Sequence, residues 1–231
     1  MAKSPFRTGR AGRIAEADSV VVIGLGRFGR ALALELMETG TEVLGIDNDE
    51  EIVQSLNGEL TQVVRADSTR EETLRQLAVH EFDRAVVAIG GDIQANILTA
   101  SILRGFEIPH LWAKATSDQH GRILEQLGVA HVTYPEAEMG RRVAHLVRGA
   151  ALDYIPVDND YSLVKMSPNS IVIGRRLGDS GIRQKYGVTV MAVRRGGEPW
   201  CNADSDTVVQ PDDTILVAGP TVKAEAFGQL R

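Results

Sequence analysis

The chain has 231 residues, a formal charge of -6 at pH 7 and a pI of about 5.4. Its hydrophobic content of 43% is enough for a packed core, which excludes a globally disordered chain. The acidic balance argues against nucleic acid as the main partner, and no apolar run approaches the ~20 residues that span a bilayer.

Residues 1–18 are predicted to form a flexible basic tail. They carry Lys3, Arg7, Arg10 and Arg13, and no apolar stretch follows these charges, so the segment is not a signal peptide. Two interpretations stay open. The tail either frays in solvent or contacts anionic lipid or an acidic partner.

From residue 19 onward, short apolar runs alternate with segments of helical periodicity. Strands are predicted at 19–24, 42–46, 61–65, 84–89, 110–114 and 130–134, and helices at 27–39, 49–57, 70–78, 92–105 and 117–127. This alternation indicates parallel strands joined by right-handed crossovers, and the continuous apolar runs indicate a sheet covered on both faces. Residues 19–134 are therefore predicted to be an α/β domain with a doubly wound, Rossmann-like parallel sheet of about six strands.

The second half of the chain is predicted to begin with a linker or crossover helix. This segment, 135–152, has a helical pattern over 135–150, with Pro135 suited to its first turn. Residues 153–231 are predicted to form a small α+β domain. Its strands are expected at 153–157, 161–166, 188–194 and 214–218, its helices at 177–186 and 221–229, and a hairpin turn at Gly196-Gly197.

Gly24, Gly26 and Gly29 form a G-x-G-x-x-G motif between the first predicted strand and the first predicted helix. In such a motif the first glycine allows the tight turn, the second lets the backbone approach a pyrophosphate, and the third lets the helix pack closely. The helix N-terminus then offers free N–H groups to an anion. The motif predicts a phosphate cradle, with a glycine-rich turn that binds nothing as the alternative.

Asp47 ends the second predicted strand, close to the distance at which a carboxylate reads a ribose. A carboxylate there accepts both ribose hydroxyls and repels a 2′-phosphate, which disfavours NADP. The alternative role is that of a helix N-cap, which Asn48 or Asp49 could also provide. Because any ribose would satisfy Asp47, ATP or ADP and NAD(H) all remain candidate ligands.

Three further features lie where strands are expected to end. Asp67-Ser68-Thr69 suits either a helix cap or a ligand contact, and both roles stay open. Gly90-Gly91 allows close backbone approach at the same edge of the sheet. Arg27 places a cation inside the glycine turn, which favours the extra charge of ATP or ADP, with a solvated surface arginine as the alternative.

Few residues suggest catalysis. Cys201 is the single cysteine and cannot form an internal disulfide, which favours a reducing, cytoplasmic setting. Glu136 and Glu138 point to different faces of a helix, and no Lys-Tyr or His-Asp constellation is evident. The histidines lack metal-ligand spacing and are expected at surface or packing positions: His80, His110, His120, His131 and His145. The pattern favours a ligand-sensing module that is not an enzyme, with an NAD(H)-dependent oxidoreductase or NAD(H)-sensing module as the alternative.

Further segments complete a recognisable pattern: Ala88-Ile89-Gly90, Ile93-Gln94-Ala95-Asn96, Trp112-Ala113-Lys114-Ala115 and Tyr134-Pro135-Glu136. With the glycine motif, they resemble the RCK (regulator of potassium conductance) family, in particular the gating subunits of bacterial Ktr potassium uptake systems, relatives of TrkA. The resemblance covers about 19–150 as an N-lobe and 153–231 as a TrkA-C-like C-lobe. The arginine-rich tail departs from the family pattern.

The resemblance implies a cytoplasmic protein that is peripheral to the inner face of the cell membrane. It implies a homodimer, assembled into an octameric ring under a KtrB- or TrkH-like potassium-translocating subunit. ATP and ADP would favour different ring shapes, with ATP activating.

The resemblance also assigns roles to residues. Arg27 would reach a terminal phosphate, and Glu136 would help to hold a cation (Mg, Ca or Na) near the phosphates. The implied nucleotide-binding residues are Gly24, Leu25, Gly26, Arg27, Phe28, Gly29, Asp47, Asn48, Asp67, Ser68, Ala88, Ile89, Gly90 and Lys114. In several members the C-lobe binds cyclic di-AMP, for which the candidates are Ile171, Val172, Arg175, Ile182 and Tyr186.

Overall fold

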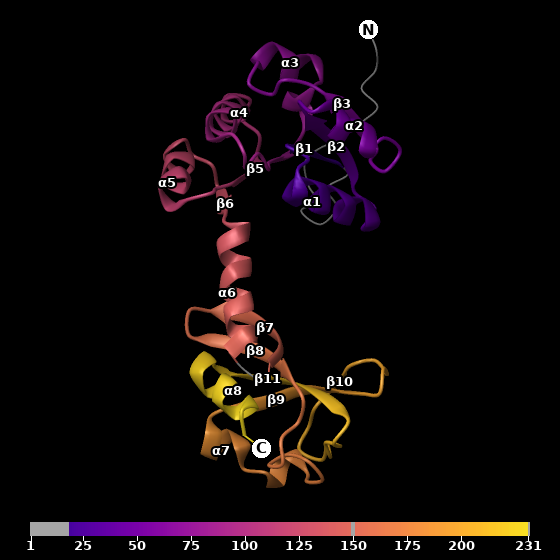
Figure 1. Ribbon diagram of the computed structural model, residues 1–231, viewed down its shortest axis with the longest axis vertical. Helices are drawn as coiled ribbons and strands as arrows, with labels where there is room; N and C mark the ends of the chain where they lie inside the picture. Colours follow the sequence, from indigo (N-terminus) through magenta and orange to yellow (C-terminus); the bar gives the residue numbers. More distant parts are fainter. Residues whose placement is uncertain (1–18, 149–150, 231) are drawn as a thin grey trace. The chain divides into compact units, whose positions relative to one another are not determined.

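The computed structural model describes residues 19–148 and 151–230 (Figure 1). The predicted basic tail, 1–18, lies outside the described residues. The chain divides into two compact units, Met1–Glu136 and Ala137–Arg231. Within the described residues, no helix combines the length and the apolar character needed to cross a bilayer.

The first unit is built on a six-stranded parallel sheet with the strand order β3-β2-β1-β4-β5-β6. The order reverses between β1 and β4, which confirms the predicted doubly wound sheet. The strands are β1 (Ser19–Ile23), β2 (Glu42–Asp47), β3 (Gln62–Arg65), β4 (Arg84–Val87), β5 (His110–Lys114) and β6 (His131–Thr133). The helices are α1 (Arg27–Glu38), α2 (Glu50–Ser55), α3 (Glu71–Gln76), α4 (Ile93–Gly105) and α5 (Asp118–Gln126), with a 3₁₀ turn, η1 (Val79–Glu81).

The apolar strands of this unit supply two separate cores, one on each face of the sheet. Side chains alternate between faces along a strand. Val21 and Ile23 of β1 therefore pack into the cluster that contains Leu103 of α4, whereas Val20 and Val22 join the cluster that contains Ala33 of α1. Strand β1 has no polar face because both of its faces are covered, as its continuous apolar run predicted.

The second unit carries a five-stranded antiparallel sheet in the order β10-β9-β11-β8-β7, which confirms the predicted α+β domain. Gly196 and Gly197 both have positive φ, and the Glu198 N–H donates to the Arg195 carbonyl oxygen (2.8 Å), so the predicted hairpin turn is confirmed. The strands are β7 (Ala151–Asp158), β8 (Tyr161–Met166), β9 (Thr189–Arg195), β10 (Cys201–Asn202) and β11 (Asp213–Pro220). The helical segments are α6 (Pro135–Arg148), η2 (Leu177–Asp179), α7 (Ile182–Tyr186) and α8 (Thr221–Gly228).

Some predicted boundaries in this unit are wrong. The continuous helix expected over 177–186 is broken, because Gly181 adopts a left-handed conformation (φ +62°) between η2 and α7. Strand β10 was not predicted, since two residues carry no periodic pattern. Strand β7 starts at Ala151, inside the segment 135–152 that was expected to be a linker.

Candidate functional site

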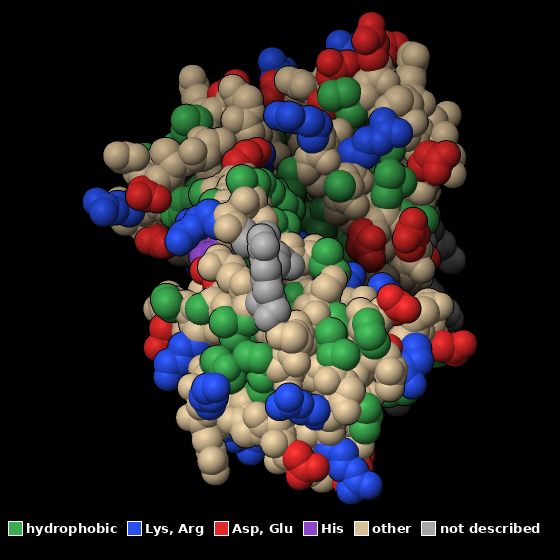
Figure 2. Space-filling view, turned by 60° about the horizontal axis from the view of Figure 1, so that its bottom comes forward, with side chains coloured by type: hydrophobic (Ala, Val, Ile, Leu, Met, Phe, Trp, Pro, Cys, Tyr) green, Lys and Arg blue, Asp and Glu red, His purple; other side chains and the backbone are tan. Residues whose placement is uncertain are grey.

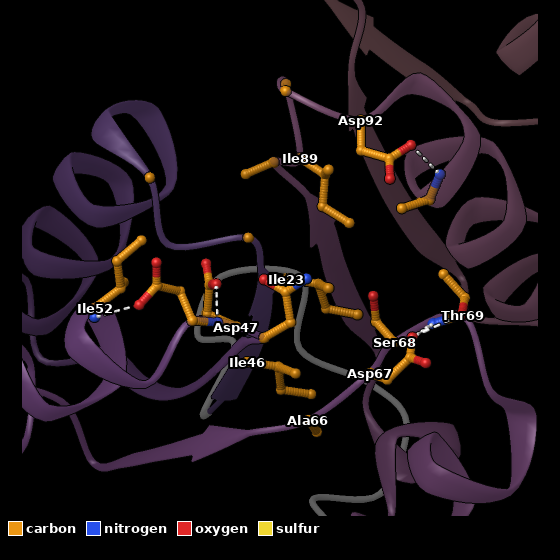
Figure 3. Close-up of a pocket in the computed structure, with 18 of the residues that line it drawn as sticks. Ile23, Ile46, Asp47, Ile52, Ala66, Asp67, Ser68, Thr69, Ile89 and Asp92 are labelled. Carbon is orange, nitrogen blue, oxygen red and sulfur yellow. Dashed lines mark hydrogen bonds between the residues drawn. The ribbon is translucent and has the colours of Figure 1, made fainter.

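A cleft of about 780 Å³ opens in the first unit, at the carboxyl ends of the parallel strands (Figure 3). Asp47 at the end of β2, Ser68 after β3 and Ile89 after β4 lie around the same hollow. The cleft therefore sits where the strand order reverses, the usual ligand position in such sheets. Its volume lies within the range of sites that hold small molecules.

Most of the residues that the sequence suggested for nucleotide binding line this cleft. They are Gly24, Gly26, Asp47, Asn48, Asp67, Ser68, Ala88, Ile89 and Gly90. Five others do not line it: Leu25, Arg27, Phe28, Gly29 and Lys114.

Sequence reasoning missed the apolar wall of the cleft, which includes Ile46, Ile52, Ala66 and Leu98. Ile46 and Ala66 directly precede Asp47 and Asp67. Apolar residues at the carboxyl ends of the predicted strands were therefore the sequence feature that could have indicated this wall.

Two glycines of the motif are required by the chain itself. Gly24 has φ +90°, and a Cβ added there would lie 2.8 Å from the Ile89 backbone nitrogen. A Cβ at Gly29 would lie 1.8 Å from the Gly24 carbonyl oxygen. The missing side chain at Gly24 lets the turn lie against the end of β4, and the missing side chain at Gly29 lets α1 pack on that turn.

Gly26 differs from both of these glycines. It is exposed, its φ is -63°, and a Cβ added there would meet no protein atom within 4 Å. Any residue could adopt this backbone conformation, so nothing within the described chain requires glycine. Gly26 lines the cleft and is also the N-cap of α1, where it provides no side-chain cap, so the first N–H groups of the helix have no side-chain acceptor from this position. An anion could approach these groups directly.

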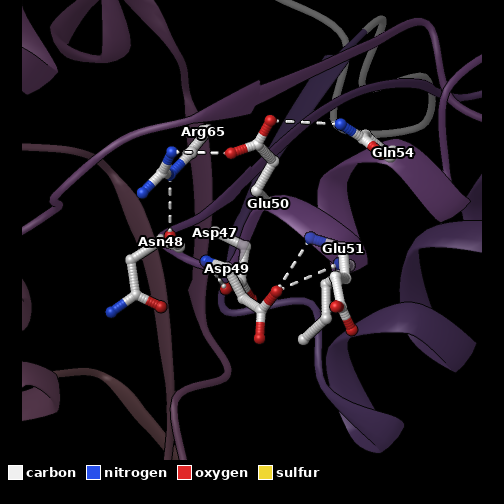
Figure 4. Close-up of polar contacts among 8 residues, drawn as sticks. Asp47, Asn48, Asp49, Glu50, Glu51, Gln54 and Arg65 are labelled. Atoms are coloured by element: carbon white, nitrogen blue, oxygen red, sulfur yellow. Dashed lines mark hydrogen bonds and ion pairs between the residues drawn. The ribbon is translucent and has the colours of Figure 1, made fainter.

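Asp47 ties the glycine turn to the end of β2. Its carboxylate accepts hydrogen bonds from the backbone N–H of Leu25 (2.6 Å) and of Asp49 (2.9 Å). The capping alternative is wrong for Asp47, because Asp49 is the N-cap of α2 and accepts from the Glu51 and Ile52 N–H groups (Figure 4). A carboxylate has about four acceptor positions, so Asp47 keeps capacity for a ligand hydroxyl.

The loop after β2 is held from the neighbouring strand. The Arg65 guanidinium donates to the Asn48 carbonyl oxygen (3.2 Å) and pairs with Glu50 (2.9 Å), as Figure 4 shows. Both charged side chains are largely exposed, so the pair shapes the loop more than it stabilises the fold.

Asp67 faces the cleft without capping α3. That helix has Arg70 as its N-cap, with no side-chain cap, so the capping interpretation is wrong. Instead, the Asp67 carboxylate accepts from the Thr69 hydroxyl (2.6 Å) and the Thr69 N–H (3.0 Å). The Thr69 hydroxyl contributes most to lowering the pKa of Asp67, so the carboxylate is ionised. Ser68 is buried and shares a hydrogen bond with Thr99 (2.9 Å).

A second cluster of predicted residues lies beside the start of α1. The Lys114 ammonium forms an ion pair with Glu136 (2.6 Å) and lies 5.7 Å from the centre of the Phe28 ring. The Lys114 side chain is 8% exposed and that of Glu136 is 63% exposed. The hydrogen bond from Lys114 is the main cause that lowers the pKa of Glu136, and the positive charge of Arg27 acts in the same direction.

Glu136 is not part of a ready-made metal site. Across residues 19–148 and 151–230, no three His, Cys, Asp or Glu side chains are grouped so as to hold a metal ion. A cation at Glu136 would therefore need further ligands, such as phosphate oxygens.

The five cyclic di-AMP candidates differ in how far they are exposed. Val172 is fully buried and Ile182 nearly so, both in the core of the second unit, where Ile171 and Tyr186 pack partly exposed. Arg175 is exposed. A hollow of about 410 Å³ in this unit is lined by Ile182 and not by the other four.

Comparison with known proteins places both units in known families. Residues 20–135 match the TrkA-N domain and residues 161–230 match the TrkA-C domain. The chain is 37% identical to Ktr system potassium uptake protein C of Bacillus subtilis over 207 residues, which cover 89% of this chain and 94% of that protein. It is 34% identical to Ktr system potassium uptake protein A of Vibrio alginolyticus over 203 residues, covering 87% of this chain and 92% of the relative.

Solved structures show the same fold. The crystal structure of the GsuK RCK domain matches with a TM-score of 0.64 at 18% identity, covering 94% of this chain and 48% of that chain. The GsuK channel bound to NAD matches with a TM-score of 0.63 at 17% identity, covering 93% of this chain and 39% of that one. This chain thus spans less than half of either GsuK chain. With its TrkA-N and TrkA-C domains and its Ktr relatives, the chain belongs to the RCK family of potassium-transport regulatory proteins.

Proposed function

We propose that this chain is the nucleotide-sensing gating subunit of a potassium uptake system. ATP or ADP binds in the cleft of the first unit and controls ion flux through a KtrB- or TrkH-like membrane subunit. The protein acts in the cytoplasm, at the inner face of the membrane. The observation that carries this proposal is the open cradle at Gly26, in a chain that aligns with 94% of a Ktr system potassium uptake protein.

The cleft offers a distinct environment for each part of a nucleotide. The first N–H groups of α1 suit the phosphates, and the Asp47 carboxylate suits the ribose hydroxyls. The apolar wall with Ile46, Ala66 and Leu98 suits a purine base. NAD(H) would satisfy the same groups, and the GsuK channel of the same fold has been solved with NAD bound.

The cluster beside α1 suits a terminal phosphate. Arg27 is exposed and follows Gly26 directly, and Lys114 supplies a second positive charge near Phe28. Glu136 is ionised and largely exposed, so it fits a cation (Mg, Ca or Na) shared with phosphate oxygens. Such a cation would reduce the repulsion between the carboxylate and the phosphates.

Replacing Arg27 with alanine is expected to weaken ATP binding more than ADP binding. The pyrophosphate common to both ligands is served by the glycine turn, whereas the extra phosphate needs a cation, for which the guanidinium is suited. A differential loss of about tenfold, or 1.4 kcal/mol, would be typical of one such contact. Calorimetry measures the two affinities, and potassium flux in vesicles that contain the membrane subunit measures activation.

Arg30, which is exposed on the same helix and donates to Ser55, provides the control. Arg30→Ala removes the same charge from α1 and should leave the ratio of the ATP and ADP affinities unchanged. An equal loss of both affinities in Arg27→Ala would assign Arg27 to the common pyrophosphate, and no loss would leave it in solvent. ATP and ADP that leave the potassium flux unchanged would contradict the gating function.

We propose that the protein acts as a homo-oligomer, a dimer assembled into an octameric ring. Helix α6 has no buried residue among those described, yet Met139, Val143 and Val147 lie four residues apart on one face. Val147 is 80% exposed. An uncovered apolar stripe of this kind is typical of an interaction surface. Figure 2 shows further hydrophobic side chains among Lys and Arg on the second unit, where Leu152 and Val222 are exposed.

Replacing Val143 with aspartate is expected to shift the protein toward smaller assemblies, because a buried unpaired charge is costly in an interface. Light scattering at micromolar concentration, with nucleotide present, measures the mass. Ala144→Asp adds the same charge about 100° further round the helix and should leave the assembly intact. A wild-type protein that is monomeric under these conditions would rule out the proposal.

We further propose that the second unit responds to cyclic di-AMP. Arg175 and the partly exposed Ile171 and Tyr186 are the candidates with surface to contact it. One calorimetric series with ATP, ADP, NADH and cyclic di-AMP tests all the ligands together. Steady turnover of NAD(H) with a small alcohol or 2-hydroxy acid would favour the oxidoreductase alternative.

A further inference from the structure

Two polar side chains are buried directly behind the cleft. Asn96 on α4 is 0% exposed and His120 on α5 is 2% exposed. The Asn96 amide nitrogen donates to the carbonyl oxygens of Ile89 (2.8 Å) and Lys114 (3.1 Å). Its amide oxygen lies 3.1 Å from His120 Nε2. Every polar atom of the Asn96 side chain is thus engaged.

The neighbouring backbone fixes the state of His120. The Thr116 N–H can only donate, and it points to His120 Nδ1 (3.3 Å), so Nδ1 is the acceptor. Nε2 therefore carries the proton and donates to Asn96, which orients the amide group with its nitrogen toward the two carbonyls. Burial lowers the pKa of His120 below its usual value of 6.5, so the ring is neutral.

Burial, and not a neighbouring charge, lowers the pKa of His120. On β5, the Lys114 ammonium is paired with Glu136 at the start of α6. After β6, the Tyr134 hydroxyl packs against Gly121, the residue that follows His120. Asn96, the neighbour on α4, is neutral. A proton added to His120 would place a charge in a buried site, and it would break the hydrogen bond that the Thr116 N–H donates to Nδ1.

The two carbonyls held by Asn96 lie at functional positions. Ile89 forms part of the cleft wall. Its backbone nitrogen lies so close to Gly24 that only a glycine fits at position 24. Lys114 ends β5 and carries the ammonium that pairs with Glu136. Asn96 therefore links the ends of two neighbouring strands, and a shift of this side chain would move both the wall at Ile89 and the Lys114 backbone.

We propose that Asn96, oriented by neutral His120, is a positioning residue of the nucleotide cleft and that protonation of His120 lowers nucleotide affinity. This inference rests on the proposed nucleotide-binding function. Neither residue touches the ligand. Asn96 holds Ile89 against the glycine turn, and His120 holds Asn96.

The test uses calorimetry of the full chain with ADP between pH 8 and pH 5.5. Asn96→Ala removes the donor that the Ile89 and Lys114 carbonyl oxygens share and is expected to lower the affinity by about tenfold at pH 8. His120→Gln keeps one acceptor for Thr116 and one donor for Asn96, so its affinity at pH 8 should stay close to that of the wild type. Because glutamine does not titrate, the wild-type affinity should fall relative to this variant as the pH drops. The fall is at most about tenfold at pH 5.5, because the pKa of His120 lies below 6.5. The titration of the ADP phosphates is common to both proteins and cancels.

Asn169 in the second unit is the matched control. It is also a buried amide, which donates to the Phe227 carbonyl oxygen (2.8 Å) and accepts from the Ile171 N–H (3.1 Å). Asn169→Ala should lower the melting temperature to a similar extent and leave ADP affinity unchanged. Equal ADP affinity of Asn96→Ala and wild type, or parallel pH profiles of wild type and His120→Gln, would overturn the inference. If Asn96→Ala fails to fold, the pH profiles decide. Absence of nucleotide binding by the wild type at pH 8 would instead contradict the proposed function, and the inference with it.

Discussion

Replacing Gly26 with valine is expected to lower the affinity for both ATP and ADP by about a hundredfold, or about 2.7 kcal/mol. A Cβ added at Gly26 meets no protein atom within 4 Å and the residue has a φ of -63°, so the fold is expected to accept valine. The same side chain would fill the space through which a phosphate approaches the first N–H groups of α1. Calorimetry measures the affinities, and the melting temperature should stay within a few degrees of the wild type.

Substitutions at two other glycines serve as comparisons for Gly26→Val. Gly105 is exposed at the end of α4, and a Cβ there also meets nothing within 4 Å, so Gly105→Val controls for valine at an open glycine. Gly29→Ala is the opposite case. Its methyl group would overlap the Gly24 carbonyl oxygen, so we expect loss of folding before any loss of binding can be measured. Undiminished nucleotide binding by Gly26→Val would show that the turn holds no phosphate.

The parallel sheet could be predicted because its sequence signals are strong and local. Strands buried on both faces must be apolar throughout, and Gly24 with φ +90° must be a glycine at that turn. The second unit was harder to predict because its elements are short. Gly181 interrupts a pattern that otherwise resembles one helix, and strand β10 exists only through its pairing with β9.

The candidate site could be predicted only in part, for a related reason. Parallel strands bring their carboxyl ends to one edge, so Asp47 and Asp67 were expected there and lie there. The pairing of Lys114 with Glu136 and the contact of Asn96 with His120 depend on which helices lie side by side. No spacing along the chain encodes these contacts. The histidines were expected at surface or packing positions, and His120 is indeed buried, but its bond to Asn96 could not be read from the sequence.

Replacing Asp47 with alanine is expected to lower the affinity for ATP and ADP alike, by at least about tenfold. The variant loses a carboxylate that would accept two ribose hydroxyls, and each charge-assisted hydrogen bond contributes roughly 1.5–3 kcal/mol. It also leaves the N–H of the buried Leu25 without its acceptor, so the melting temperature should fall as well. Calorimetry and thermal unfolding measure the two effects. Asp49→Ala, which removes the N-cap of α2, should cost about 1 kcal/mol of stability and gives the size of a loss of stability without the loss of the Asp47 carboxylate.

The Asp47 carboxylate accepts from the Leu25 N–H and is also expected to bind the ribose. A second ligand distinguishes these two roles. If the carboxylate binds the ribose, the wild type should lose affinity when 2′,3′-dideoxy-ATP replaces ATP, because the hydroxyls are gone. Asp47→Ala should then bind the two nucleotides equally, since the group that distinguishes them has been removed. This double comparison isolates the contact between carboxylate and ribose from the loss of the Leu25 hydrogen bond, which affects both ligands to the same extent. If Asp47→Ala still prefers ATP by the wild-type factor, the carboxylate only holds the glycine turn, and another group must read the ribose.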